Sequence, residues 1–117
     1  MIRIETKSRE FSEVEEYLMT VSPAITSLKD VEDGVVIPVT GYLTFTDIKD
    51  GGDESEIFSL ITESNEVYCC QSATFKRTFM DIAGIMKDKP FSIIKCSGVT
   101  KAGRDFIYCT LDISSVK

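Results

Sequence analysis

The chain has 117 residues, of which 43% are hydrophobic and 27% charged, so we expect one folded domain rather than a disordered protein. No stretch approaches the roughly 18 apolar residues of a membrane span, and the N-terminus lacks the apolar core of a signal peptide, which favours an intracellular protein. The net charge is −6, but it is unevenly distributed: residues 1–66 hold 5 Lys/Arg and 15 Asp/Glu (net −10), whereas residues 67–117 hold 8 and 4 (net +4).

Residues 1–34 predict an extension ahead of the main domain. Residues 1–6 alternate as a short strand, and Ser12 followed by Glu15 fits a capping box at the start of a helix. We expect Pro23 to end this helix. Its apolar spacing predicts a buried face made of Phe11, Val14, Leu18 and Val21.

Residues 35–48 predict the first long strand. Gly41 indicates a bend or bulge within it, and Pro38 indicates a sheet edge at its start. One parity holds Val39, Leu43 and Phe45, and the other, which we expect to face outward, holds Tyr42, Thr44 and Thr46. The acidic loop 47–54, with two glycines, is expected to be exposed.

Residues 56–70 predict a β-hairpin that turns at residues 63–66. On its first strand we expect Phe58 and Leu60 to point inward and Ile57 and Ile61 outward, although the apolar flanks leave this parity open. On the return strand we expect Val67 and Cys69 to point in and Tyr68 to point out.

A helix is predicted to follow directly, with Ser72 as its N-cap and Lys87 near its end. Its apolar residues recur at intervals of four, three and four, so one face holds Phe75, Phe79, Ile82 and Met86. The run Asp88-Lys89-Pro90 is expected to stop it. Residues 91–98 and 106–113 then predict two more strands, joined by a turn that contains Gly98 and Gly103.

Five strands with one helix between the third and the fourth is the order of the oligonucleotide-binding (OB) fold, a small closed barrel. We therefore expect a mainly β protein: a single domain over residues 1–117, with a five-stranded OB-fold barrel over residues 35–113 behind the N-terminal helical extension. An open sheet with a helix on one face is the rival architecture.

Residues 58–68 resemble the second and third strands of nucleic-acid-binding OB domains, with Thr62 where those have Asp and Asn65 where they have Gly. Asn tolerates the left-handed conformation that Gly would supply. The chain is also similar to the small OB-fold single-stranded-DNA-binding proteins of lactococcal phages, most visibly in residues 39–45, 74–79 and 98–106. It lacks the acidic C-terminal tail of many such proteins, which argues against recruitment of partners through a tail.

This resemblance implies non-sequence-specific binding of single-stranded DNA in phage replication or recombination, in the cytoplasm of the bacterial host, with a phage or host recombinase as a further partner. Such binding needs outward aromatic side chains for base stacking and cations for the phosphates. The sequence offers four of each, namely Tyr42, Tyr68, Phe106 and Tyr108, and Lys49, Lys95, Lys101 and Arg104. The aromatics have an alternative role at a subunit interface, and Lys101 and Arg104 an alternative as solvated turn residues.

No enzyme chemistry is indicated. The chain has no histidine, no phosphate-binding loop motif and no Cys-x-x-Cys pair, so we expect neither a metal site nor a cofactor. The cysteines are interpreted as small buried apolar residues. The second functional hypothesis is an OB-fold adaptor that binds protein and not DNA. Spare outward apolar residues (Ile57, Ile61 and Phe106) favour a homo-oligomer, most simply a dimer.

Overall fold

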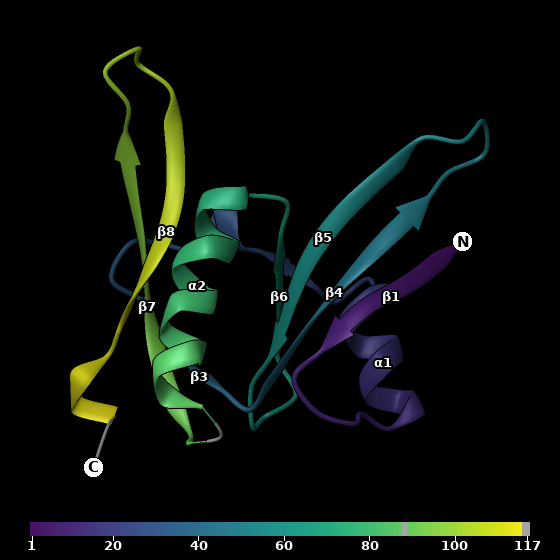
Figure 1. The fold of residues 1–117 in the computed structure, drawn as a ribbon, viewed down its shortest axis with the longest axis horizontal. Helices are drawn as coiled ribbons and strands as arrows, with labels where there is room; N and C mark the ends of the chain where they lie inside the picture. Colours follow the sequence, from purple (N-terminus) through teal and green to yellow (C-terminus); the bar gives the residue numbers. More distant parts are fainter. Residues whose placement is uncertain (88, 116–117) are drawn as a thin grey trace.

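The computed structural model of the chain describes residues 1–87 and 89–115. Asp88 of the predicted helix stop, and residues 116–117 at the C-terminal end, lie outside this part. The described residues form eight strands in two sheets and two α-helices, which confirms the prediction of a mainly β protein (Figure 1). Neither of these helices has the length and apolar character that crossing a lipid bilayer requires.

The larger sheet contains five strands and includes the predicted hairpin. Its strand order is β1 (Ile2–Lys7), β4 (Gly41–Ile48), β5 (Glu54–Ile61), β6 (Val67–Cys70) and β2 (Thr26–Ser27). Neighbouring strands are antiparallel except for β2, which runs parallel to β6. In the turn between β5 and β6, Asn65 adopts a φ of 65°, as expected of a residue that replaces Gly.

The smaller sheet contains three strands, in the order β3 (Val36–Val39), β7 (Phe91–Val99) and β8 (Asp105–Leu111). The predicted first long strand is divided between the two sheets, because it breaks at Thr40 into β3 and β4. Gly41 lies at this break, where an added Cβ would come within 2.7 Å of the Phe11 ring. The bend predicted at Gly41 is therefore confirmed, as is the edge position of the strand that holds Pro38.

Helix α2 (Ala73–Met86) forms as predicted. The hydroxyl of Ser72 caps it by accepting a hydrogen bond from the Phe75 amide at 3.1 Å. The four residues of its predicted apolar face are all buried in the main core cluster: Phe75, Phe79, Ile82 and Met86. This cluster also takes residues from β3, β5 and β7, so α2 joins the two sheets.

Helix α1 (Glu13–Thr20) begins with the predicted capping box, in which Ser12 and Glu15 each accept from the other's backbone amide. Its predicted buried face is half right: Phe11 and Leu18 pack partly buried against a core cluster, but Val14 is 67% and Val21 56% exposed, and Met19 is fully buried instead. The carbonyl of Met19 accepts a hydrogen bond from the Ser59 hydroxyl at 2.8 Å. This bond attaches the end of α1 to β5, and Met19 rather than Val14 faces the sheet.

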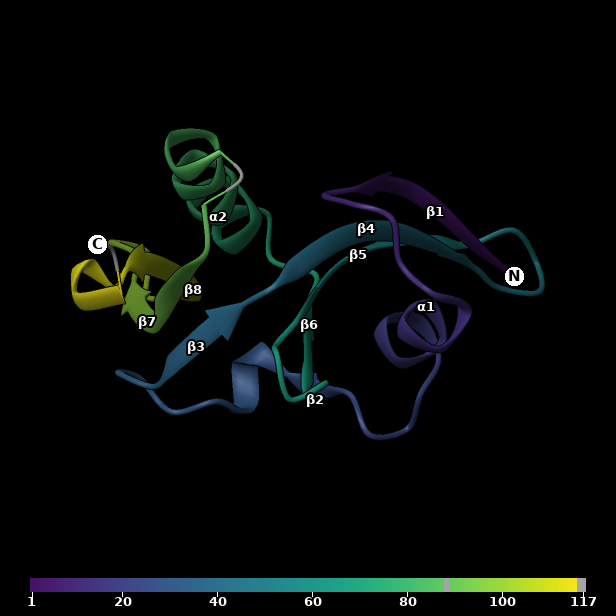
Figure 2. The same ribbon diagram turned by 90° about the horizontal axis from the view of Figure 1, so that it is seen from below.

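The larger sheet is covered on both faces, by α2 on one side and α1 on the other (Figure 2). Phe58 and Leu60 lie on the α2 side, as predicted, and Ile57 and Ile61 lie on the opposite side. That opposite side is a second core under α1, where Ile61 is only 1% exposed, and not a free surface. Val67 and Cys69, the residues of β6 predicted to point inward, also belong to this second core. They therefore lie on the opposite face of the sheet from Leu60.

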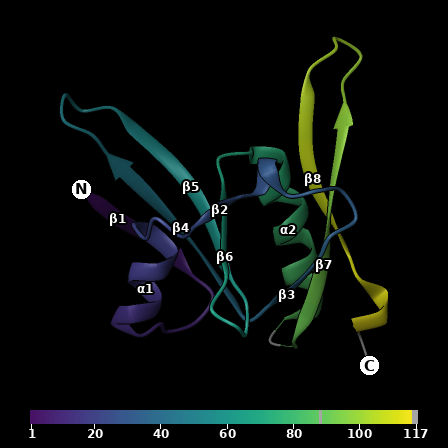
Figure 3. The ribbon, with the colours of Figure 1, turned by 180° about the vertical axis from the view of Figure 1, so that it is seen from behind.

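The described pairings do not close a barrel, and the predicted five-stranded OB barrel is not confirmed. Closure would require β6 to pair with β8, but β2 occupies the second edge of β6. Helix α2 packs along β8, on the side that is nearer to β6 in the views of Figure 1 and Figure 3. Two of its hydroxyls serve the backbone of β8: the Cys109 amide donates to Thr78 Oγ1 at 3.2 Å, and Ser72 Oγ donates to the Ile107 carbonyl at 3.5 Å.

Replacing Thr78 by Val should test whether α2 substitutes for a strand at this edge. The variant keeps the shape of the side chain but leaves the buried Cys109 amide without its acceptor, which costs about 1–3 kcal/mol. We expect urea unfolding to show a loss of that size. Thr74→Val on the same helix is the matched control, because the Thr74 side chain makes no hydrogen bond among the described residues. Equal losses in the two variants would contradict the role of Thr78.

Candidate nucleic-acid interface

Tyr42 is not an outward aromatic residue, and the prediction that it is one is wrong. Its ring lies 4.9 Å from that of Phe79 and 6.1 Å from that of Phe58, measured between ring centroids, and it packs on the main core cluster. The alternation of side chains between the two faces shifts by one residue at the break. Val39 and Tyr42 therefore both face this cluster, although they are three positions apart.

Tyr68 is the strongest stacking candidate in the sequence, and its predicted outward orientation is also wrong. The register places it opposite Leu60, on the side of the sheet that faces α2, and its half-buried ring packs on the main core cluster. Its hydroxyl donates to Glu66 Oε2 at 3.2 Å. The pKa of Tyr68 is raised mainly by partial burial and to a smaller extent by the nearby Glu66 carboxylate.

Phe106 and Tyr108 do face outward, as predicted. The alternate residues of β8, Ile107 and Cys109, are buried in the main core cluster, so Phe106 and Tyr108 lie on the other face of the hairpin. Their half-buried rings contact each other, with centroids 5.7 Å apart and planes inclined by 31°. Within the described part of the chain, neither ring packs on a core cluster.

Gly98 makes room for the Phe106 ring. It is the cross-strand partner of Phe106, and a Cβ at this position would lie 2.6 Å from Phe106 Cζ. The ring therefore lies across β7. Phe106 and Tyr108 together form a continuous aromatic surface on the β7–β8 hairpin, which we call the aromatic pair.

Two of the predicted cations lie in the turn of the hairpin that carries the aromatic pair. Lys101 and Arg104 are exposed in the turn that joins β7 to β8, where Thr100 and Arg104 are linked by a backbone hydrogen bond of 2.8 Å. Neither side chain takes part in an ion pair with any described residue. They are therefore available to an anionic ligand.

Lys95, by contrast, is buried, so its prediction as a phosphate contact is wrong. It is 4% exposed, and its ammonium group donates to the Val31 carbonyl at 2.7 Å and to Asp33 Oδ1 at 3.1 Å. Asp33 also accepts a hydrogen bond from Ser97. The pKa of the Asp33 carboxyl group is lowered mainly by this hydrogen bond and to a smaller extent by the hydrogen bond from Lys95. Through these bonds Lys95, which lies on β7, holds the segment that precedes β3.

Lys49 is exposed at the tip of the other hairpin, β4–β5. Five acidic residues occur on this tip and on the strand ends next to it: Asp47, Asp50, Asp53, Glu54 and Glu56. The two hairpins project to the same side of the molecule and diverge on either side of α2 (Figure 1). The structure thus separates Lys49 from the other candidates and surrounds it with negative charge.

A groove of about 910 Å³ is lined in part by the β7–β8 hairpin. Phe106 is among the hairpin residues that line it, and Lys29, Gln71 and Ser72 line it from other elements. Sequence reasoning missed Lys29 and Gln71, and it identified Ser72 only as a helix cap. Gln71 and Ser72 lie where β6 meets α2, which was the available signal for them, whereas Lys29 lies in the short 3-10 helix Leu28–Asp30 after β2. The approach of the hairpin to these residues depends on long-range contacts.

All four cysteines are free. Burial raises the pKa of Cys69, Cys70 and Cys109 to about 11, so these thiols stay protonated at neutral pH and are poor nucleophiles. Within the described residues, no three Cys, Asp or Glu side chains gather closely enough to hold a metal ion.

Comparison with family models, curated proteins and solved structures finds no match to the chain. Its function is therefore inferred from its own geometry.

Replacing Asp33 by Asn should destabilise the protein at pH 7, because the buried Lys95 ammonium would lose its counter-ion. The folded-state pKa of Asp33 is lowered, so its carboxylate stabilises the protein above the ordinary Asp pKa and this contribution is lost as the pH falls through the folded-state value. Urea unfolding should show a gap between wild type and variant at pH 7 that shrinks below about pH 4. Asp30→Asn, at an exposed position nearby, should show no such gap. A gap independent of pH would contradict the assignment.

Proposed function

We propose that this protein binds single-stranded DNA without sequence specificity, through the outer face of the β7–β8 hairpin. The observation that carries the proposal is the aromatic pair, two adjacent rings that contribute to neither core and share a hairpin with two cations that have no ion-pair partner among the described residues. Every base has a π-face, so stacking on Phe106 and Tyr108 would add about 1–3 kcal/mol per base whatever the sequence. Lys101 and Arg104 would contact the phosphates.

The charge distribution supports a path for the strand along this hairpin only. The acidic residues of the β4–β5 hairpin would repel phosphates, and that hairpin diverges from β7–β8. A protein of net charge −6 is thereby compatible with a polyanionic ligand. Lys49 has no part in this version of the site, because carboxylates surround it.

The chain order supports an open variant of the OB fold. Strands β3 and β4 together, then β5, β6, α2, β7 and β8, follow the order of that fold. What is missing is the pairing of β6 with β8. With the resemblance to phage proteins, this order supports a role in phage replication or recombination within a bacterial host. We also propose that the protein forms a dimer and that a phage or host recombinase is a further partner.

A protein-binding adaptor is the second candidate, and a specific observation favours it. Helix α1 exposes an apolar stripe at helical spacing: Val14 (67%), Tyr17 (51%) and Val21 (56%). Such a stripe is typical of a surface that meets a partner. The adaptor hypothesis predicts no affinity for single-stranded DNA at low salt.

Replacing Phe106 by Ala should weaken binding of a fluorescently labelled dT oligonucleotide about tenfold, because one base would no longer stack on an aromatic ring. Tyr108→Ala should act in the same direction. Fluorescence anisotropy at low salt measures the dissociation constants. Tyr17→Ala is the matched control, since it removes an exposed ring from α1, on a different element.

Gly98→Ala gives an independent arm of this experiment. The added methyl group would displace the Phe106 ring without removing it, so affinity should also fall. An affinity that is unchanged in Phe106→Ala, or that falls equally in Tyr17→Ala, would exclude the aromatic pair as the binding surface.

The double variant Lys101→Gln/Arg104→Gln should bind dT oligonucleotides more weakly and with a smaller dependence on salt. The slope of log affinity against log salt concentration should fall by about 0.7 for each phosphate of a single strand that the variant no longer neutralises. Titrations at several NaCl concentrations measure the slope. An unchanged slope would show that these two side chains contact no phosphate.

A further inference from the structure

A separate cavity lies at the opposite end of β7 from the hairpin turn. Its volume is about 420 Å³, and it is lined by residues 8–9, the strand break at residues 39–42, Lys87 and residues 89–91. Since β7 has nine residues at about 3.3 Å each, the cavity lies roughly 26 Å from the hairpin turn. Neither Phe106 nor Tyr108 is among its described lining residues, so it is distinct from the aromatic pair.

The walls of this cavity are positively charged. Three of its lining residues are cations, Arg9, Lys87 and Lys89, of which Arg9 is ion-paired with Glu15 at 3.0 Å. Clustered cations in a concave site attract and concentrate anions.

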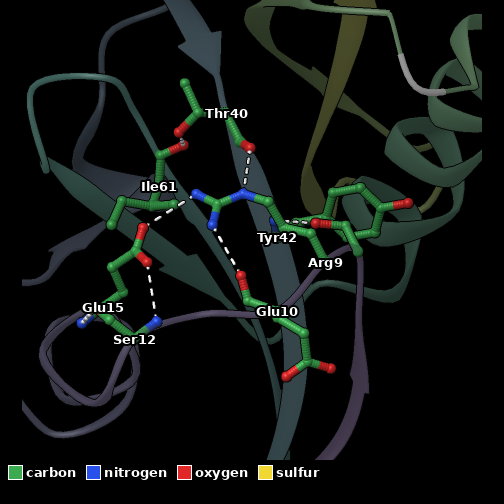
Figure 4. Close-up of polar contacts among 8 residues, drawn as sticks. Arg9, Glu10, Ser12, Glu15, Thr40, Tyr42 and Ile61 are labelled. Atoms are coloured by element: carbon green, nitrogen blue, oxygen red, sulfur yellow. Dashed lines mark hydrogen bonds and ion pairs between the residues drawn. The ribbon is translucent and has the colours of Figure 1, made fainter.

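Arg9 is held in place with hydrogen-bonding capacity to spare (Figure 4). Its guanidinium group lies 4.4 Å from the centre of the Phe11 ring, and it donates to the Thr40 carbonyl, the Glu10 carbonyl and Glu15 Oε2, each at 3.0 Å. These bonds use three of its five N–H donors. The fixed planar group thus retains two donors for another acceptor.

Lys87 occupies a backbone conformation that does not suit a lysine. It follows the last residue of α2 with φ 55° and ψ −122°, a region in which Gly is strongly preferred. Its amide donates to the Ala83 carbonyl at 2.8 Å, so the conformation is part of the helix end. A cation therefore lines the cavity at a position where Gly would suit the backbone better. Lys87 and Lys89 are exposed, and neither forms an ion pair with a described residue.

From these observations we propose that the cavity binds a phosphate group of a nucleotide. Lys87, Lys89 and the spare donors of Arg9 contact the phosphate oxygens, because charge-assisted hydrogen bonds from ammonium and guanidinium groups suit that anion. Tyr42, Pro90 and Phe91 supply apolar wall next to these cations, which fits the sugar or base attached to the phosphate. The phosphate belongs either to a free nucleotide or to a unit of a bound strand.

The first test compares dTMP, thymidine and inorganic phosphate by titration followed in ¹H–¹⁵N correlation spectra. The amide signals of Gly41, Lys87 and Lys89 should shift with dTMP, and inorganic phosphate should compete. Thymidine should bind at least tenfold more weakly than dTMP. Equal affinity for thymidine and dTMP would overturn the proposal.

Lys87→Gly separates a structural role from a binding role. Gly relieves the unfavourable φ, so the variant should be at least as stable as wild type in urea unfolding, while its affinity for dTMP should fall about tenfold. Lys89→Glu should lose dTMP affinity at least as strongly. Arg77→Glu, an equal charge change at an exposed position on α2, should bind dTMP nearly as well as wild type. Unchanged dTMP affinity in Lys87→Gly and Lys89→Glu would overturn the proposal.

The same variants keep this inference distinguishable from the proposed function. Phe106→Ala should bind dTMP like wild type even where it loses affinity for dT oligonucleotides. If Lys89→Glu also weakens oligonucleotide binding and Arg77→Glu does not, the phosphate is that of a bound strand. If only dTMP binding changes, the ligand is a free nucleotide. Loss of dTMP affinity in Phe106→Ala equal to that in Lys89→Glu would overturn the separate site.

Discussion

The break at Thr40 and Gly41 is the constraint on which the rest of the structure depends. One strand leaves the smaller sheet there and enters the larger one, and only Gly fits beneath the Phe11 ring. The broken ladder is satisfied locally, because Thr40 donates to the Ile61 carbonyl through its amide and its hydroxyl, and Arg9 donates to the Thr40 carbonyl (Figure 4). The two sheets diverge from this point, which separates the two hairpins.

Divergence of the sheets also explains why the barrel stays open. Two strand edges, one on β6 and one on β8, would otherwise be left with unpaired backbone groups. The N-terminal extension supplies β2 for the first edge, and α2 supplies the hydroxyls of Ser72 and Thr78 for the second. Each edge is thus covered by a different element. The extension is part of the fold rather than an appendage to it.

The sequence predicted features whose causes are local. The Ser72 cap, the apolar face of α2, the capping box at Ser12 and the alternation of β8 each depend on residues within a few positions of one another. The parity of β5 and β6 could not be read in the same way. Both faces of these strands are apolar, as at Ile61 and Leu60, because both are buried, so alternation carried no information about which face meets α2. Barrel closure likewise depends on competition between distant segments for the same edges.

The same reasoning explains which candidate binding residues remain available. Lys95 is used by the fold because its partner Asp33 lies 62 positions away in the chain, a distance at which sequence patterns carry no signal. Tyr42 and Tyr68 lie where the larger sheet faces the main core, so their rings pack against core residues. Side chains near the ends of elements have fewer neighbours to satisfy them. The positive charge of the second half of the chain therefore stays accessible at the two ends of β7, and both sites inferred for this protein lie there.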